Sequence, residues 1–228
     1  ENATDTAVEA IRALRTNIYF SMLDAKNNVL MITGAAPEAG KSFISSNLAT
    51  VIAQSGKKVL LIDADMRKGY LEQLFSTHVA PGLSELLSGE ASPVEAVQQT
   101  GIENLFFISH GNYTQSSSEL LMNKRLSDLI EQASKRYDYV IIDTPPVLAV
   151  TDAAIVGQHV GMTLMVARYG YTTAQDLDNA ARRLVQSNIN IKGVILNGIK
   201  RDAFNSYNCY SYGSYTAGSD KKAAKSKG

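Results

Sequence analysis

The sequence has one cysteine, no net charge and no long apolar run, and each of these absences removes a class of protein. The single cysteine, Cys209, cannot build a disulfide framework within the chain and suits a reducing compartment. Basic and acidic residues both number 22, so the overall charge gives no indication of a nucleic-acid partner. No apolar stretch approaches the roughly 20 residues of a membrane-spanning helix, and no signal peptide opens the sequence. A chain of 228 residues is still long enough to bury a sizeable core.

The stretch Thr33–Ser42 has the pattern of a phosphate-binding P-loop. It follows the apolar run Val29–Ile32, contains Gly-Lys-Ser, and leads into a segment with helical spacing. Backbone N–H groups of such a loop converge on phosphates, and the helix N-terminus adds its positive dipole. Lys41 would reach the β- and γ-phosphates, and Ser42 would ligate Mg²⁺. The residues expected to bind nucleotide are Ala36, Pro37, Glu38, Ala39, Gly40, Lys41, Ser42 and Phe43.

One residue departs from the usual P-loop. The first glycine, expected six residues before the lysine, is replaced by Ala35, while Gly34 stands one place too early.

Two further apolar runs end in aspartate. The first, Val59–Ile62, is followed by Asp63 and Asp65, which point into one cleft if the backbone stays extended. In isolation a solvated loop would explain this pair, but one β-α unit after a P-loop it favours Mg²⁺ and nucleophile chemistry. The second run, Tyr139–Ile142, is followed by Asp143 in the Walker B pattern, in which the aspartate holds Mg²⁺ directly or through water.

Apolar strands alternate with helical segments along the chain, which predicts an α/β fold: a doubly wound, mostly parallel sheet flanked by helices. In such a sheet the site lies at the carboxyl ends of the strands, where the P-loop and all three aspartates fall. Asn197 ends the last strand, where meeting a nucleotide base and forming a turn are equally compatible with the pattern. The other expected elements are strands at 105–108, 163–167 and 191–197 and helices at 4–23, 118–136 and 172–187. Residues 82–89 and 93–97 are expected to form short helical turns in a surface excursion.

The N-terminal helix, expected within residues 1–24, has an apolar stripe and a charged face. Glu9, Arg12 and Arg15 recur at three-residue spacing on that face. From the pattern alone a solvated i,i+3 ion pair is favoured over a subunit contact.

From about Arg201 the periodic pattern ends. Four tyrosines, Tyr207, Tyr210, Tyr212 and Tyr215, are separated by small polar residues, and lysines follow. We expect residues 201–228 to form a flexible tail, distinct from a domain at 1–200. Without a kinase site nearby, the tyrosines are best interpreted as a low-complexity tail; with one, they are phosphate acceptors.

Taken together, these motifs resemble the bacterial tyrosine kinases of polysaccharide export. The resemblance rests on the alanine-containing P-loop, the Asp-x-Asp-Met-Arg-Lys sequence from Asp63, the Ile-Ile-Asp-Thr-Pro-Pro sequence around Asp143, and the tyrosine cluster, and it spans nearly the whole chain. Glu9, Arg12 and Arg15 match the family's Glu-x-x-Arg-x-x-Arg motif for ring assembly, which reverses the interpretation of those three residues.

The resemblance implies autophosphorylation of the tail tyrosines with Mg-ATP, largely between neighbours in a ring homo-oligomer, with an octamer as the candidate size. It implies a membrane polysaccharide co-polymerase, fused or separate, a cognate tyrosine phosphatase, and a position at the inner face of the cell membrane. Because the chain begins with Glu1, we expect it to be part of a longer protein. The cycle of phosphorylation would regulate capsule or exopolysaccharide chains.

The chemistry of the motifs agrees with this activity. Lys41 would stabilise developing charge, and Ser42, Asp65 and Asp143 would fix Mg²⁺. Asp63 is a general base for the tyrosine proton, although exchanging its role with Asp65 fits equally well. Tyr70, close after Asp65, is a second candidate acceptor, and our hypothesis is that its ring blocks the cleft until it is phosphorylated.

Two rival interpretations are weaker. A partitioning or septum-positioning ATPase shares the fold but has an early P-loop lysine, where this chain has Ala36, and no tyrosine-rich tail. A nucleotide-binding scaffold without catalysis would not need the full set of Lys41, Ser42 and three aspartates. The other large class of protein kinases is excluded because its His-Arg-Asp and Asp-Phe-Gly motifs are missing. Within the family pattern, one loop departs: residues 115–117 are Gln-Ser-Ser instead of Pro-Asn-Pro.

Overall fold

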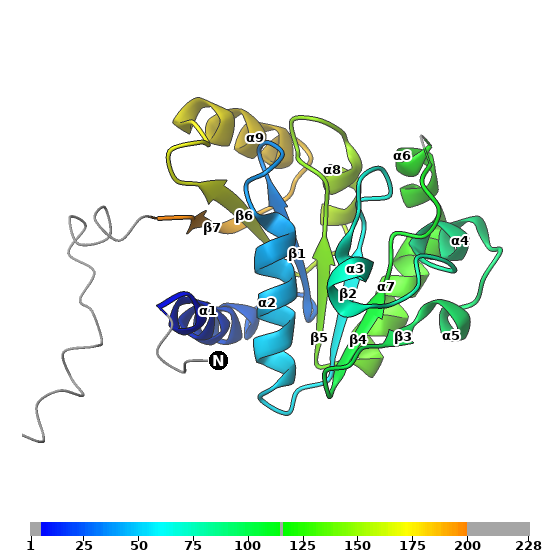
Figure 1. The fold of residues 1–228 in the computed structure, drawn as a ribbon. Helices are drawn as coiled ribbons and strands as arrows, with labels where there is room; N and C mark the ends of the chain where they lie inside the picture. Colours follow the sequence, from blue (N-terminus) through cyan, green and yellow to red (C-terminus); the bar gives the residue numbers. More distant parts are fainter. Residues whose placement is uncertain (1–5, 115, 200–228) are drawn as a thin grey trace, which may run out of the picture. The chain divides into compact units, whose positions relative to one another are not determined.

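A sheet of seven strands forms the centre of the fold (Figure 1). This computed structural model describes residues 6–114 and 116–199. The strands are β1 Val29–Gly34, β2 Val59–Asp63, β3 Gln98–Gln99, β4 Leu105–Ile108, β5 Tyr139–Asp143, β6 Met162–Arg168 and β7 Ile191–Asn197. Their order is β3-β4-β2-β5-β1-β6-β7, and every neighbouring pair is parallel except β3 with β4. The predicted doubly wound, mostly parallel sheet is confirmed.

Helices cover both faces of this sheet, which explains why its central strands are continuous apolar runs. Every residue of β1 and β2 is buried. Because side chains alternate along a strand, Leu30 and Ile32 pack on one face, and Val29 and Met31 pack on the other. The first face carries α1 Thr6–Met22, α2 Lys41–Ala53 and α3 Leu71–Phe75; the second carries α4 Leu83–Ser88, α7 Lys124–Arg136, α8 Asp152–Gly157 and α9 Ala174–Gln186.

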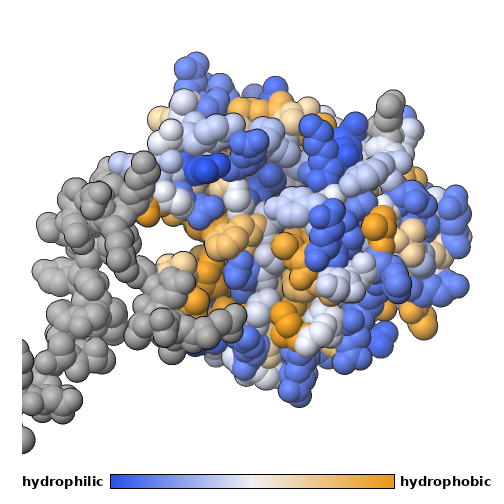
Figure 2. All heavy atoms as spheres, in the orientation of Figure 1, coloured by the Kyte–Doolittle hydropathy of each residue, from blue (hydrophilic) through white to orange (hydrophobic). Residues whose placement is uncertain are grey.

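The predicted apolar stripe of α1 faces α2. Ile11 and Ile18 are buried in the same core cluster as α2, with Leu14 and Met22 partly buried against it. Figure 1 shows α1 beside the lower part of α2. The end of the helix leaves Phe20 and Leu23 exposed, and an apolar patch lies over α1 in Figure 2.

None of the described helices combines the length and the apolar composition that crossing a bilayer requires.

The expected single helix at 118–136 is wrong: the chain forms two helices, α6 Ser117–Leu121 and α7. Asn123 interrupts them in extended conformation, and its side-chain oxygen accepts the amide proton of Arg125. An asparagine favours this capping position because its side chain satisfies an otherwise unpaired amide at the start of the helix. The apolar spacing runs through the break, so periodicity alone did not reveal it.

Three short elements were not predicted: α3, α8 and the edge strand β3. Each has six residues or fewer, which is too short for a period to show. The segment 82–97 forms the expected short helices, α4 and α5 Pro93–Ala96. Our expectation that this segment is a surface excursion is wrong for α4, where Leu83, Leu86 and Leu87 are buried in the core.

Candidate active site

The loop between β1 and α2 has the tight backbone that a P-loop requires. Glu38 and Gly40 have positive φ angles of 59° and 90°. A Cβ atom at Gly34 would lie 2.9 Å from the carbonyl oxygen of Val166, so this early glycine is required by a close backbone approach. Ala35 is fully buried, and its carbonyl accepts the amide proton of Leu148. The residue that replaces the usual glycine therefore packs into the core.

Two side chains from the neighbouring strands β6 and β7 hold this loop. Asn197 Nδ2 donates to the carbonyl of Ala39 at 3.1 Å, and an Arg168 guanidinium nitrogen donates to the carbonyl of Glu38 at 3.2 Å. Asn197 therefore contacts the backbone of the P-loop, which neither of its two predicted roles included.

Lys41 lies at the start of α2 and is 8% exposed, while Phe43 is half-exposed.

Asp143, at the end of β5, is hydrogen-bonded to two side chains of α2. Its two carboxylate oxygens accept protons from Ser42 Oγ at 2.6 Å and Ser45 Oγ at 2.8 Å. Burial raises its pKa to about 6, against the opposing effect of the Ser42 hydroxyl. Ser45 was not predicted as a site residue. The signal was available, since residues three apart on a helix share one face and Ser42 was already expected to meet Asp143.

Asp63 and Asp65 follow β2 but have different surroundings. Asp63 is 1% exposed, and its oxygens accept the amide protons of Asp65 at 3.0 Å and Leu71 at 3.3 Å. Asp65 is partly exposed, and one oxygen, Oδ1, accepts the amide protons of Arg67 at 3.3 Å and Lys68 at 2.9 Å. Both carboxylates lie at the carboxyl edge of the sheet, as expected, but only Asp63 is enclosed.

The three aspartates influence one another electrostatically. Asp63 and Asp143 are partners in the β2–β5 register. Burial and then the charge of Asp143 raise the pKa of Asp63 well above its usual range. A cation at this edge would relieve that repulsion, and carboxylate and hydroxyl oxygens are the ligands Mg²⁺ prefers. In the described part of the chain no cluster of three or more His, Cys, Asp or Glu side chains could hold a metal by itself. Ser42 and Asp143, whose side chains are hydrogen-bonded, supply oxygen atoms of the kind that Mg²⁺ prefers, so the residues present fit such an ion.

The remaining predicted residues lie elsewhere. Tyr70 precedes α3 and is 44% exposed at the end of the loop that carries Asp65. Glu9 and Arg12 pair on the exposed face of α1 at 2.5 Å, whereas Arg15 turns inward and donates to the carbonyl of Val51 on α2. The four tail tyrosines are outside the described residues.

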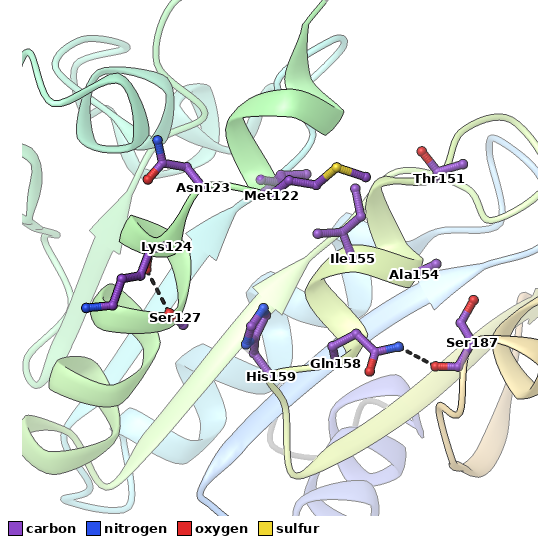
Figure 3. Close-up of a pocket in the computed structure, with 11 residues that line it drawn as sticks. Met122, Asn123, Lys124, Ser127, Thr151, Ala154, Ile155, Gln158, His159 and Ser187 are labelled. Carbon is purple, nitrogen blue, oxygen red and sulfur yellow. Dashed lines mark hydrogen bonds between the residues drawn. The ribbon is translucent and has the colours of Figure 1, made fainter.

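A hollow of about 660 Å³ lies on another part of the molecule, between the α6–α7 junction, α8 and the end of α9. Figure 3 shows its lining side chains, with bonds from Ser127 to the carbonyl of Lys124 and from Gln158 to that of Ser187. None of the P-loop residues or the three aspartates lines it. This hollow is therefore separate from the residues that we expect to bind phosphate, which lie at the strand ends.

The P-loop, the paired strand-end aspartates and the parallel sheet define a P-loop nucleotide-binding domain, and comparison with known proteins agrees. The family model described as "AAA domain" matches residues 29–193, and the chain belongs to that family. The chain is 21% identical to the cell division ATPase MinD of Pyrococcus furiosus, covering 79% of each chain with a TM-score of 0.66, which shows a shared fold.

A narrower family is also shown. The kinase domain of the Escherichia coli tyrosine kinase ETK is 51% identical, with a TM-score of 0.85, over 88% of this chain and 79% of that one. The putative tyrosine-protein kinase in the cps region of Klebsiella pneumoniae is 51% identical over 97% of this chain. The chain therefore belongs to the kinase domains of the bacterial tyrosine kinases, as the resemblance implied. It spans 31% of the length of the Klebsiella protein.

Proposed function

We propose that this chain is an ATP-dependent protein-tyrosine autokinase that phosphorylates Tyr207, Tyr210, Tyr212 and Tyr215. One observation carries the proposal. The last strand, β7, ends at Asn197, whose side chain is bonded to the P-loop, and the tyrosine-rich segment follows from there in the sequence. An extended chain from residue 200 to 215 reaches at most about 50 Å, so its own site and a neighbour's are both within range. From the family we propose transfer mainly in trans, within a ring.

The reaction needs a proton acceptor and charge stabilisation. The tyrosine Oη forms a bond to the γ-phosphorus of ATP, the bond from that phosphorus to the β–γ bridging oxygen breaks, ADP leaves with the electron pair, and the phenolic proton passes to an aspartate. Lys41 and the loop amides stabilise the charge on the phosphates. A tyrosine hydroxyl has a pKa near 10, so it is a poor nucleophile until a base takes its proton.

The two aspartates after β2 are suited to different parts of this work. Both oxygens of Asp63 accept backbone amides, whereas Oδ2 of Asp65 has no hydrogen bond to the described residues. We propose that Asp65 faces the reacting groups. We also propose that Asp63 holds the loop and shares the phenolic proton with Asp65. Ser42, Asp65 and Asp143 would hold Mg²⁺, which supplies charge neutralisation at the phosphates when bound.

The wider setting is proposed from the family. Residues 1–200 would act as the kinase domain and 201–228 as its substrate tail. Glu9, Arg12 and Arg15 would join subunits into a ring, with an octamer as the candidate size, and Tyr70 would be a second acceptor that regulates access. We propose a membrane polysaccharide co-polymerase as activator, a tyrosine phosphatase that reverses the reaction, a position at the inner face of the membrane, and control of capsule or exopolysaccharide chains.

The test is peptide mapping by mass spectrometry after incubation with Mg-ATP. Lys41→Met protein, incubated alone, should carry no phosphate on the tail tyrosines, because charge on the phosphates is no longer stabilised. When it is mixed with an active protein lacking 201–228, phosphate should appear on Tyr207, Tyr210, Tyr212 or Tyr215. Lys124→Met, at a side chain 85% exposed on α7, is the matched control and should behave as wild type.

Two results would contradict the proposal. ATP consumption by wild type without any phosphotyrosine would indicate a motor ATPase of the partitioning type. Full rescue of polymer production by Lys41→Met in cells would indicate a scaffold whose catalysis is dispensable.

A further inference from the structure

Residues 113 and 114 contact the loop that carries Asp65, and they directly precede residues 115–117, where the sequence departs from the family pattern. Tyr113 Oη donates to the carbonyl of Gly69 at 2.9 Å, and the amide of Thr114 donates to the carbonyl of Met66 at 3.2 Å. Both bonds join segments more than 40 residues apart in the sequence. The loop is therefore held from outside as well as by its own turn.

Gly69 connects the Tyr113 hydroxyl to Asp65. Its amide donates to the carbonyl of Asp65 at 2.7 Å, so the same residue closes the turn and accepts the tyrosine bond. A Cβ atom here would lie 2.5 Å from His110 Cδ2 and 2.7 Å from Asp63 Oδ2. Because this space is full, a displacement of Gly69 would be transmitted to the neighbouring aspartates.

Tyr113 is itself held in place. Its ring stacks on the buried ring of His110, with centroids 4.6 Å apart and planes 11° apart. The preceding Asn112 donates from its backbone amide and its side chain to Glu85 Oε1, at 3.1 and 2.8 Å. Burial and then the charges of Glu72, Asp63 and Asp65 raise the pKa of Tyr113, so its hydroxyl keeps its proton and remains a donor.

We propose that Tyr113 is a positioning residue that fixes the turn from Asp65 to Gly69, and through it the Asp65 carboxylate, for phosphoryl transfer. The catalytic part of this inference rests on the proposed kinase function. The hydrogen bond from Tyr113 to Gly69 and its effect on the loop do not depend on that function. Tyr113 is 62% exposed, so we expect it to contribute far more to the order of the loop than to global stability.

The experiment compares Tyr113→Phe with wild type and Tyr139→Phe. The Tyr113 variant keeps the stacked ring and loses only the donor; Tyr139, at the amino end of β5, is on the opposite edge of the sheet. Hydrogen–deuterium exchange is measured for the peptide 64–71, together with kcat, the KM for ATP and Tm. We expect Tyr113→Phe to exchange about fivefold faster in this peptide, which corresponds to losing one hydrogen bond of about 1 kcal/mol. We also expect kcat to fall by a similar factor, with KM changed less than twofold and Tm within about 2 °C.

Each result has a defined meaning. Exchange equal to wild type overturns the proposal whatever the kinase assay shows. Faster exchange with unchanged kcat overturns the catalytic part. A wild type that makes no phosphotyrosine refutes the proposed function, whereas the exchange result still decides whether Tyr113 holds the loop. Tyr113→Leu, which removes the ring stack as well, should give a larger change in both exchange and kcat, and a smaller one would count against the role of the stack.

Discussion

The ends of strands β5 and β2 each carry a buried aspartate, yet the two are bonded in different ways. Asp143 accepts protons from two serine hydroxyls on α2, whereas Asp63 accepts from two backbone amides of its own loop. A hydroxyl rotates and can exchange its partner for a metal or a phosphate. A backbone amide in a closed turn has no such freedom.

We propose that this difference separates a ligand-binding carboxylate, Asp143, from a loop-holding one, Asp63. Asp143 can be released by rotation of Ser42 and Ser45, so its bonds are compatible with binding a cation. Asp63 cannot leave its amides without opening the turn that carries Asp65. On this proposal the same residue type at the same edge of the sheet has two roles, and its hydrogen-bond donors decide which.

The largest effect is expected from Asp143→Asn. Removing this charge should lower the rate of tyrosine phosphorylation about 10²- to 10³-fold, the range for losing one preorganised electrostatic group. Exchange in the peptide 64–71 should stay within twofold of wild type, because the amides of Asp65 and Leu71 donate to Asp63 and the amide of Ala64 donates to the backbone carbonyl of Asp143, which the substitution keeps. Kinase rates and hydrogen exchange measured on one preparation check both statements, and faster loop exchange would break the distinction between the two aspartates.

Asp63→Asn should have a smaller effect on rate and a larger one on the loop. The amides of Asp65 and Leu71 donate to different oxygens of Asp63, and asparagine replaces one of those oxygens with an NH2 donor, so one of the two amides loses its partner. We expect phosphorylation to slow by about 10- to 10²-fold and the amides of Asp65 and Leu71 to exchange faster. Asp178→Asn, at an exposed residue of α9, serves as the control for an aspartate substitution. Unchanged exchange at both amides would show that Asp63 does not hold the loop.

The smallest effect concerns pH. The folded pKa of Asp143, about 6, is above its value of 3.8 in an unfolded chain, so its favourable contribution to stability is complete below 3.8 and is lost as the pH rises through 6. Over that window, without nucleotide, the free energy of unfolding of wild type should fall relative to Asp143→Asn by at most about 1.4 kcal/mol per pH unit. Urea titrations from pH 4 to 7 measure it. A difference that grows in favour of wild type with pH would contradict a raised pKa.

Much of the site could be predicted from the sequence because its signals are local. The run Thr33–Ser42 and the aspartates that end apolar strands need only neighbouring residues to be recognised, and parallel topology brings strand ends to one edge. Ser45 was within reach of the same reasoning. Asn123 was not recognised as a helix cap because the apolar spacing continues across it.

What remained beyond the sequence depends on contacts between distant segments. The alternating apolar strands determined the sheet, the P-loop and the aspartates by short-range rules of periodicity and chain geometry. Only the tertiary structure decided that Asn197 holds the P-loop, that Asp63 and Asp143 differ in their donors, and that Tyr113 contacts Gly69. These contacts depend on register, burial and the angle of approach, which arise when segments as much as 158 residues apart are packed together.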